Sequence, residues 1–282
     1  MPELPEVETI VRGLRPKLEG RRLVRVQQRC KALRFPLPEN MPARLEGRSV
    51  RHIGRRAKYI QIHLDDGQVL LCHLGMSGRF VMHDGGQPLP ALDKHDHIIL
   101  TTDQGTEIRF NDARRFGMMD VVRAGELEGH KLLRDLGPEP LGNDFSGPGL
   151  AAALQGRRTP IKAALLDQNV VAGLGNIYVS EALFFAGLSP RRQAYTVQGG
   201  RAEALAQAVR DVLRRAIEAG GSSLRDYVQA DGELGYFQHQ WAVYGREGEA
   251  CPDCGCDSAA TGGIRRFTQS GRSTFFCARR QR

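Results

Sequence analysis

The residues at the start of the chain have the types and spacing of a nucleophile beside an acid. Pro2 follows the initial methionine, and Glu3 follows Pro2. If Met1 is removed, Pro2 becomes a secondary amine with a pKa of about 7.7 to 8.0, against about 10.4 for a lysine, so part of it is unprotonated at neutral pH. Such an amine attacks carbonyl or hemiacetal carbons to form Schiff bases, and a neighbouring carboxyl group can supply a proton. The alternative is a proline-marked helix entry, which explains Pro5 but leaves Pro2 and Glu3 without a role.

Lysine is scarce in this chain, so each lysine is a candidate for proton transfer. Of the 40 basic residues only six are lysines, and the other 34 are arginines. An arginine side chain does not readily lose its proton and cannot replace a lysine that must do so. Lys58 and Lys162 are therefore candidate site residues, although a GC-rich genome would produce the same bias.

A glycine-rich segment has the features of a phosphate site. Residues 172–176, Ala-Gly-Leu-Gly-Asn, bring bare backbone to the expected start of a helix at Asn176. Amide groups and the helix dipole favour a phosphate at such a position. Arg157 lies just upstream and favours the same interpretation, while a plain turn between two helices remains the alternative.

Two short loops carry side chains suited to filling the space of an extruded base. Arg114 and Phe116 lie at a probable strand-to-loop junction, and Met76 lies between two glycine residues. Apolar or aromatic wedges beside arginine can replace a base that leaves the helical stack. Loop packing is the alternative. His95 and His97 have the spacing of a metal pair on a strand, but no third ligand is apparent nearby.

Four of the six cysteines lie within the last 32 residues, which suggests a metal site. Cys251 and Cys254 have the CxxC spacing of a zinc knuckle, and Cys277 extends the site. A second knuckle beginning at Cys277 would place its partner at position 280, where the chain has Arg280. Cys256 offers a fourth thiolate in its place.

Alternating apolar and polar positions predict antiparallel strands over residues 22–120, with turns at residues 65–67 and 103–105. Strands joined in this way form a sandwich or a barrel. A stretch rich in glycine and proline over residues 136–149 predicts a linker. Residues 265–276 predict a hairpin that turns at Ser270 and Gly271 and carries Arg272 at its tip.

The chain becomes helical after the linker. Thr159 as N-cap and Pro160 at the first helical position predict a short helix that ends near Asp167. A second helix should begin at Asn176. Apolar residues at three-and-four spacing predict a helix with one buried face over residues 201–219.

Composition indicates a globular protein with a polyanionic partner. The chain has 282 residues, 41% of them hydrophobic, which excludes the disordered and collagen-like classes. Its net charge of +8 and pI near 9.4 favour nucleic acid. No apolar run approaches the ~18 residues of a membrane span, and the acidic start lacks the features of a signal peptide. We therefore expect a cytoplasmic, nucleoid-associated protein with free thiols rather than disulfides.

Taken together, these motifs resemble those of bacterial formamidopyrimidine-DNA glycosylases, the Fpg family. The segments PELPEVE, RRAKY, HLGMSG, KHDH, DARRFG, LGPEPL, GLGNIY and GRSTFFC occur in this order. The resemblance implies an α+β multidomain fold. An antiparallel β-sandwich with a flanking helix is expected over residues 1–135, a linker over 136–149, a helix-two-turns-helix domain over 150–240 and a zinc-finger-type β-hairpin over 245–282.

The resemblance also implies an activity, the removal of oxidised purines from double-stranded damaged DNA by a monomer that flips the base. Pro2 is then the Schiff-base nucleophile, Glu3 the acid that protonates the deoxyribose, Lys58 the residue for β-elimination and Arg272 the residue for δ-elimination. The implied DNA contacts are Met76, His95, Arg114, Phe116, Arg157, Lys162 and Asn176.

Two departures from the family pattern concern the zinc ion, of which one per chain is expected. Arg280 stands where the family has a fourth cysteine, and residues 257–261 form an insertion. Zinc bound by Cys251, Cys254, Cys256 and Cys277 and a hairpin without metal both remain open.

Two other functions fit part of the sequence. An endonuclease VIII-type enzyme has the same nucleophile but prefers oxidised pyrimidines; Leu4 disfavours it, because that branch typically has glycine there. A non-catalytic protein that binds damaged DNA would form no covalent adduct.

Residues 222–236 are expected to line the lesion pocket.

Overall fold

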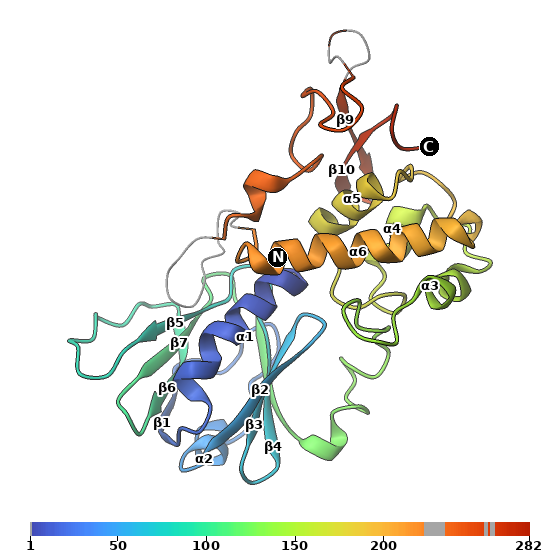
Figure 1. Ribbon diagram of the computed structural model, residues 1–282. Coiled ribbons are helices and arrows are strands. Elements are labelled where there is room, and N and C mark those ends of the chain that lie inside the picture. The colour runs from blue at the N-terminus through green and yellow to red at the C-terminus, as the bar shows by residue number, and fades with distance from the viewer. Residues whose placement is uncertain (1, 223–234, 257–258, 260–262) are drawn as a thin grey trace. The chain divides into compact units, whose positions relative to one another are not determined.

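The structure is a computed structural model that describes residues 2–222, 235–256, 259 and 263–282. The chain divides into two compact units. The first comprises Met1–Arg134 and Ala219–Tyr236, and the second comprises Asp135–Glu218 and Phe237–Arg282. Figure 1 traces both units along the chain. Most of the predicted lesion-pocket segment, residues 223–234, lies outside the described residues. The domain boundaries given above stay a prediction.

The first unit is a helix packed on two antiparallel four-stranded sheets. In one sheet the strand order is β2-β3-β4-β8, and in the other it is β1-β6-β7-β5. The first sheet contains β2 (Val50–Arg56), β3 (Tyr59–Leu64), β4 (Gln68–His73) and β8 (Met118–Arg123). The second contains β1 (Leu23–Gln28), β5 (Arg79–His83), β6 (Asp96–Thr102) and β7 (Glu107–Asn111). The predicted hairpins at residues 65–67 and 103–105 join β3 to β4 and β6 to β7.

Helix α1 (Leu4–Leu18) begins at a capping box and a proline in its first turn, both of which favour a helix start. Its apolar residues Val7, Ile10, Val11 and Leu14 share one hydrophobic core with residues of both sheets. The helix contacts β2 and β3, so the start of the chain is anchored to the sheet that carries Lys58. The short helix α2 (Met41–Leu45) and the 3-10 helix η1 (Ala124–Glu126) complete the unit.

The second unit contains the helices and the C-terminal hairpin. Its helices are α3 (Gly147–Leu154), α4 (Ile161–Leu166), α5 (Asn176–Phe185) and α6 (Gly200–Glu218), with 3-10 turns η2 (Ala194–Thr196) and η3 (Phe237–Gln240). Helix α6 packs on α3 and α5. The hairpin consists of β9 (Ile264–Gln269) and β10 (Arg272–Cys277), and β10 contacts α5. In Figure 1 the red hairpin lies beside α5. The predicted α+β architecture with antiparallel sheets, helices and a terminal hairpin is confirmed.

Two local details differ from the sequence-based expectation. Helix α4 begins at Ile161, because Pro160 is extended and forms a bridge with Gln193 instead of opening the helix. Gly147 belongs to the first turn of α3, since the Ser146 hydroxyl accepts a hydrogen bond from the Gly149 amide and caps that helix. The bridge of Pro160 joins residues that are distant in sequence, so local patterns do not encode it, whereas the cap of α3 is a local contact.

Among the residues that the structure describes, none of the helices combines the length and the apolar character needed to cross a membrane.

Candidate active site

Pro2 and Glu3 lie at the start of α1, where Glu6 holds the backbone. Glu3 is the N-cap residue of α1 and is buried, and its N–H donates to Glu6 Oε2 at 2.8 Å. Glu6 Oε1 accepts a second hydrogen bond, from the Ser222 N–H at 2.9 Å. Ser222 in turn pairs with Tyr236. One buried carboxylate therefore fixes both the start of the chain and the two ends of the 222–236 segment.

Lys58 lies in the tight turn between β2 and β3, and only 6% of it is exposed. Arg55 donates from Nε to Glu8 Oε2 at 3.0 Å and from Nη1 to the Ala57 carbonyl at 3.0 Å. Ala57 has a φ of 53°, a left-handed conformation that such a tight turn requires. The Arg55 guanidinium thus fastens the turn of Lys58 to α1, the helix that begins beside Pro2 and Glu3.

The ion pair between Glu8 and Arg55 is reflected in the acidity of Glu8. Burial alone would raise the pKa of this carboxyl, but hydrogen bonds and charge from Arg55 and then Arg12 hold it below its usual value. Glu8 is therefore ionised at neutral pH, and the link between α1 and the Lys58 turn is charged.

His73 is a neighbour of Lys58 that the sequence interpretation did not select. It pairs with Tyr59 across β3 and β4, and their ring centroids are 4.9 Å apart. Burial, followed by the charges of Lys58 and Arg34, lowers the pKa of His73 to about 4. A neutral imidazole therefore lies beside Lys58 at neutral pH. The only sequence signal for it was its place in the strand register opposite the residue after Lys58.

The residues predicted to fill the space of a flipped base lie close together in the first unit. Met76 is 40% exposed and Phe116 is 42% exposed, and the Arg114 guanidinium stacks 4.7 Å from the centroid of the Phe116 ring. Gly75 has a φ of 64°, and a Cβ atom there would lie 2.2 Å from the Phe116 carbonyl carbon. The two loops approach each other so closely that only glycine fits at this position.

Asp112 locks these two loops together and was not singled out from the sequence. Its buried carboxylate accepts a hydrogen bond from the Ser77 hydroxyl at 2.5 Å and from the Gly117 N–H at 2.7 Å. Ser77 Oγ also accepts a hydrogen bond from the Arg114 N–H at 3.2 Å. One carboxylate therefore positions the loop of Met76 relative to that of Arg114.

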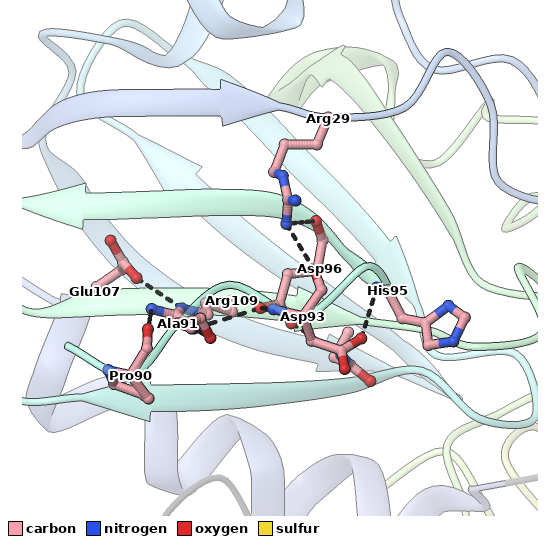
Figure 2. A network of polar contacts seen from close by, with 9 residues as sticks. Arg29, Pro90, Ala91, Asp93, His95, Asp96, Glu107 and Arg109 are labelled. Atoms are coloured by element: carbon pink, nitrogen blue, oxygen red, sulfur yellow. Dashed lines mark hydrogen bonds and ion pairs between the residues drawn. The ribbon is translucent and has the colours of Figure 1, made fainter.

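His95 projects from a loop that a buried charged network holds to the second sheet. Figure 2 shows its ring pointing away from that network. Arg109 donates from Nε to Glu107 at 2.6 Å and lies 3.4 Å from Asp96, while it also binds the Pro90 and Ala91 carbonyls. The His95 N–H donates to Asp93 Oδ1 at 2.6 Å. The network fixes the backbone and leaves the imidazole at the surface.

His97 does not share the surface position of His95. It is buried, and its Nε2 lies 2.9 Å from the Asp112 carbonyl. The strand register shifts between Asp96 and Ile98, which places the two histidines in different environments. A metal pair formed by His95 and His97 is therefore not supported.

In the second unit, Asn176 and Lys162 converge on the backbone beside Arg272. Asn176 is the first residue of α5, as predicted, and its Nδ2 donates to the Ser273 carbonyl at 3.0 Å. Lys162 is buried, and its Nζ donates to the same carbonyl at 3.1 Å and to Thr274 Oγ1 at 2.7 Å. These bonds favour a role for Lys162 in supporting the hairpin.

Arg272 follows the two-residue turn of the hairpin and is exposed. Ser270 and Gly271 both have positive φ values, 49° and 72°, as the predicted tight turn requires. Arg157 is partly exposed and forms a 2.9 Å ion pair with Asp167. Both guanidinium groups can therefore contact a ligand in solution.

Four cysteines near the C-terminus form a possible metal site. The Sγ atoms of Cys251, Cys254, Cys256 and Cys277 all lie within 4.8 Å of one another. Cys277 Sγ lies 3.6 Å from Cys254 Sγ and 3.7 Å from Cys256 Sγ. Four thiolates around a zinc ion with bonds of ~2.3 Å would be separated by roughly 3.8 Å, so the cluster fits a tetrahedral site. Among the described residues, this is the one group of this kind.

The fold and the cysteine cluster define a class of protein: an α+β protein with an N-terminal β-sandwich, a helical unit and a C-terminal hairpin beside a cluster of four cysteines. Two family models match the chain, the formamidopyrimidine-DNA glycosylase N-terminal domain over residues 1–119 and the H2TH domain of the same glycosylase over residues 136–228. The chain belongs to the formamidopyrimidine-DNA glycosylase family.

Curated relatives and solved structures agree with this assignment. Formamidopyrimidine-DNA glycosylases of Rhodospirillum centenum and Ruegeria pomeroyi are 59% and 56% identical, each over 100% of both chains. The crystal structure of MutM (Fpg) from Thermus thermophilus superposes with a TM-score of 0.84 at 42% identity and covers 99% of this chain and 98% of that one. Lactococcus lactis Fpg in complex with N7-benzyl-Fapy-dG-containing DNA gives a TM-score of 0.87 at 31% identity, with 100% of both chains covered.

Proposed function

We propose that this chain is a bifunctional DNA glycosylase and AP lyase that removes oxidised purines, namely 8-oxoguanine and formamidopyrimidines, from double-stranded DNA. One observation carries the proposal. The Pro2-Glu3 pair lies at a buried, hydrogen-bonded helix start, and the turn of Lys58 is tied to the same helix through Arg55. The names of the relatives support the substrate class.

The proposed chemistry begins with the Pro2 amine after removal of Met1. The amine attacks C1′ of the damaged nucleotide and a C–N bond forms while the bond between C1′ and the base breaks. The amine loses its N–H proton in this step, and the departing base gains one. Glu3 donates a proton to the ring oxygen of the deoxyribose, which opens the sugar and gives a Schiff base. We assign Lys58 to the β-elimination of the 3′ phosphate and Arg272 to the subsequent δ-elimination.

DNA binding follows from charge and from exposed side chains. The net charge of +8 favours a polyanion. Met76, Arg114 and Phe116 would fill the space left by the flipped nucleotide, since they are held together by Asp112 and are exposed. The proposed contacts to the DNA backbone are His95, Arg157 and Asn176, with Lys162 acting on the same hairpin as Arg272.

Zinc is the metal that the cysteine cluster suits best, because a tetrahedral set of thiolates is typical of structural zinc. Cys251, Cys254, Cys256 and Cys277 would hold one ion per chain. A structural zinc ion supplies a cross-link that stabilises a small domain. Its proposed task here is to hold the hairpin of Arg272.

Borohydride trapping on an 8-oxoguanine duplex tests the covalent step. We expect a stable adduct that mass spectrometry maps to Pro2, and no adduct when Met1 is retained or the terminal amine is acetylated. Trapping at another residue, or excision without any adduct, would contradict the assignment of Pro2.

Lesion preference is tested separately. Excision of 8-oxoguanine opposite cytosine should exceed excision of thymine glycol in the same sequence. The reverse order would favour the endonuclease VIII-type activity, and tight binding without excision of either lesion would favour a damaged-DNA-binding protein.

A further inference from the structure

Arg280 occupies the position where a second CxxC knuckle would place its thiol. Cys277 is followed by Ala278, Arg279 and Arg280, so the spacing predicts a cysteine at residue 280. The cluster has four thiols without it, because Cys256 contributes the fourth sulfur. The side chain at position 280 is therefore not needed as a ligand.

The Arg280 side chain binds the end of α5. Its Nε donates to the Phe184 carbonyl at 2.9 Å, and its Nη2 donates to the Phe185 carbonyl at 3.2 Å. The Phe184 carbonyl also accepts a hydrogen bond from the Gly187 N–H at 3.0 Å. A carbonyl oxygen has two lone pairs, and the C-terminal end of a helix favours a positive charge, so a guanidinium group is well matched to this position. The guanidinium carbon also lies 4.8 Å from the centroid of the Phe184 ring.

The same guanidinium reaches the first cysteine knuckle. Arg280 Nη1 forms an ion pair with Asp253, which lies between Cys251 and Cys254. Phe184 belongs to the same apolar cluster as Cys251, Cys256, Cys277 and Phe275. One side chain therefore links the first knuckle, the end of β10 and the end of α5, all within the second unit.

We propose that Arg280 is a positioning residue that attaches the metal-binding finger, residues 245–282, to the end of α5. In this arrangement Cys256 is the fourth ligand, in place of a residue at position 280. The inference rests on the metal site proposed above. It assigns to Arg280 a part in orienting the hairpin that carries Arg272, and this part does not involve ligation of the metal ion.

Hydrogen bonds close the turn after Cys277. The Gln281 N–H donates to the Cys277 carbonyl at 2.9 Å, and the Cys277 N–H donates to Gln281 Oε1 at 2.9 Å. A thiol introduced at position 280 would therefore lie in an ordered turn beside Cys277.

Variants that move the fourth thiol from position 256 to position 280 test the ligand assignment, and this test needs no DNA. We expect Cys256→Ser to lower zinc affinity by at least about tenfold, measured by competition with a chromophoric chelator. The double variant Cys256→Ser with Arg280→Cys should recover most of that affinity. Unchanged affinity in Cys256→Ser, or no recovery in the double variant, would overturn the exchange of ligand positions.

Hydrogen exchange tests the fastening role. In Arg280→Ala the amides of residues 186–189 and 264–282 should exchange at least about tenfold faster, the factor expected for one lost charged hydrogen bond. Zinc content should stay at one per chain. Arg279→Ala is the matched control, because Arg279 is an exposed arginine in the same turn. Arg280→Lys should give an intermediate rate, since lysine can keep the ion pair but not both carbonyl bonds.

The activity of Arg280→Ala on damaged DNA distinguishes a positioning role of Arg280 from a general loss of stability. Arg280→Ala should raise KM for damaged duplex and slow δ-elimination, while the single-turnover rate of base excision at saturating enzyme stays unchanged. Exchange no faster than in Arg279→Ala, or loss of zinc in Arg280→Ala, would overturn the fastening role. These readouts on metal and amides remain informative even if the chain prefers another lesion.

Discussion

The first unit and the finger both use charged groups to hold candidate site residues, but they depend on different supports. In the first unit, Arg109, Asp96 and Glu107 form a buried network across neighbouring strands, and a large apolar core surrounds it. The finger has a much smaller apolar cluster, and four cysteines lie inside it. A small core seldom stabilises a domain alone, so a metal ion and a side chain that attaches the finger to α5 are expected there.

Removal of the metal ion should have the largest effect on folding, and only the finger should lose structure. Structural zinc supplies on the order of 10 kcal/mol of binding free energy in small zinc domains, so its loss should unfold the hairpin. We expect Cys277→Ser to lack zinc by elemental analysis and to lose amide protection in β9 and β10. Protection in β1 to β8 should not change.

Cys30→Ser is the control for Cys277→Ser, since Cys30 is a half-buried cysteine of the first unit. It should retain zinc and the hairpin. Equal loss of protection in both units of Cys277→Ser would contradict the separation of their supports.

Arg109→Ala should have the next largest effect and should act on the first unit. Removal of one partner leaves Asp96 and Glu107 buried without their counter-charge, which costs about 3–5 kcal/mol of the free energy of unfolding. Urea denaturation measures this loss. Arg25→Ala, at an exposed position on β1, should change stability by less than about 0.5 kcal/mol. Similar values for the two variants would show that the network does not stabilise the sheet.

His73 predicts a pH dependence confined to the first unit. Its pKa is about 4 in the folded protein, against about 6.5 for an unperturbed histidine. The unfolded chain therefore binds more protons between these values, and stability falls as the pH drops from 6.5 to 4, by at most about 3 kcal/mol. His73→Gln should flatten this part of the stability profile. His52→Gln, on a largely exposed side chain, should leave it unchanged. A profile equally steep in His73→Gln would refute the assignment.

The smallest effect is expected for the link between α1 and the turn of Lys58. A double-mutant cycle with Glu8→Gln and Arg55→Ala should give a coupling of roughly 1 kcal/mol in stability. Arg55→Ala should also slow β-elimination more than it weakens DNA binding, because the turn of Lys58 loses its attachment to α1. Additive effects would show that the ion pair does not position the turn.

Much of the architecture could be predicted where burial follows a local period. Alternating residues predicted the β3–β4 and β6–β7 hairpins, three-and-four spacing predicted α6, and Ser270 with Gly271 predicted the turn before Arg272. These patterns work because each side chain's face depends on its own backbone. The start of α4 could not be predicted, because Pro160 pairs with Gln193, which lies far along the chain.

The candidate site also has features that the sequence predicts and features that it does not. The chemistry proposed for Pro2 and Glu3 and the metal site proposed for the cysteines follow from residue type and spacing. The neighbours that orient them do not: His73 beside Lys58, Asp112 between two loops, and Glu6 at Ser222 come from segments distant in sequence.

The sequence by itself determined which reactive groups this protein has, because an amine, a carboxyl or a thiol keeps its chemistry in any fold. It also determined most hairpins and helices, since periodic burial is local. Only the tertiary structure decided which groups support them. Cys256 as fourth sulfur and Arg280 on the end of α5 depend on contacts between residues up to 96 positions apart, and such contacts form only when the chain has folded.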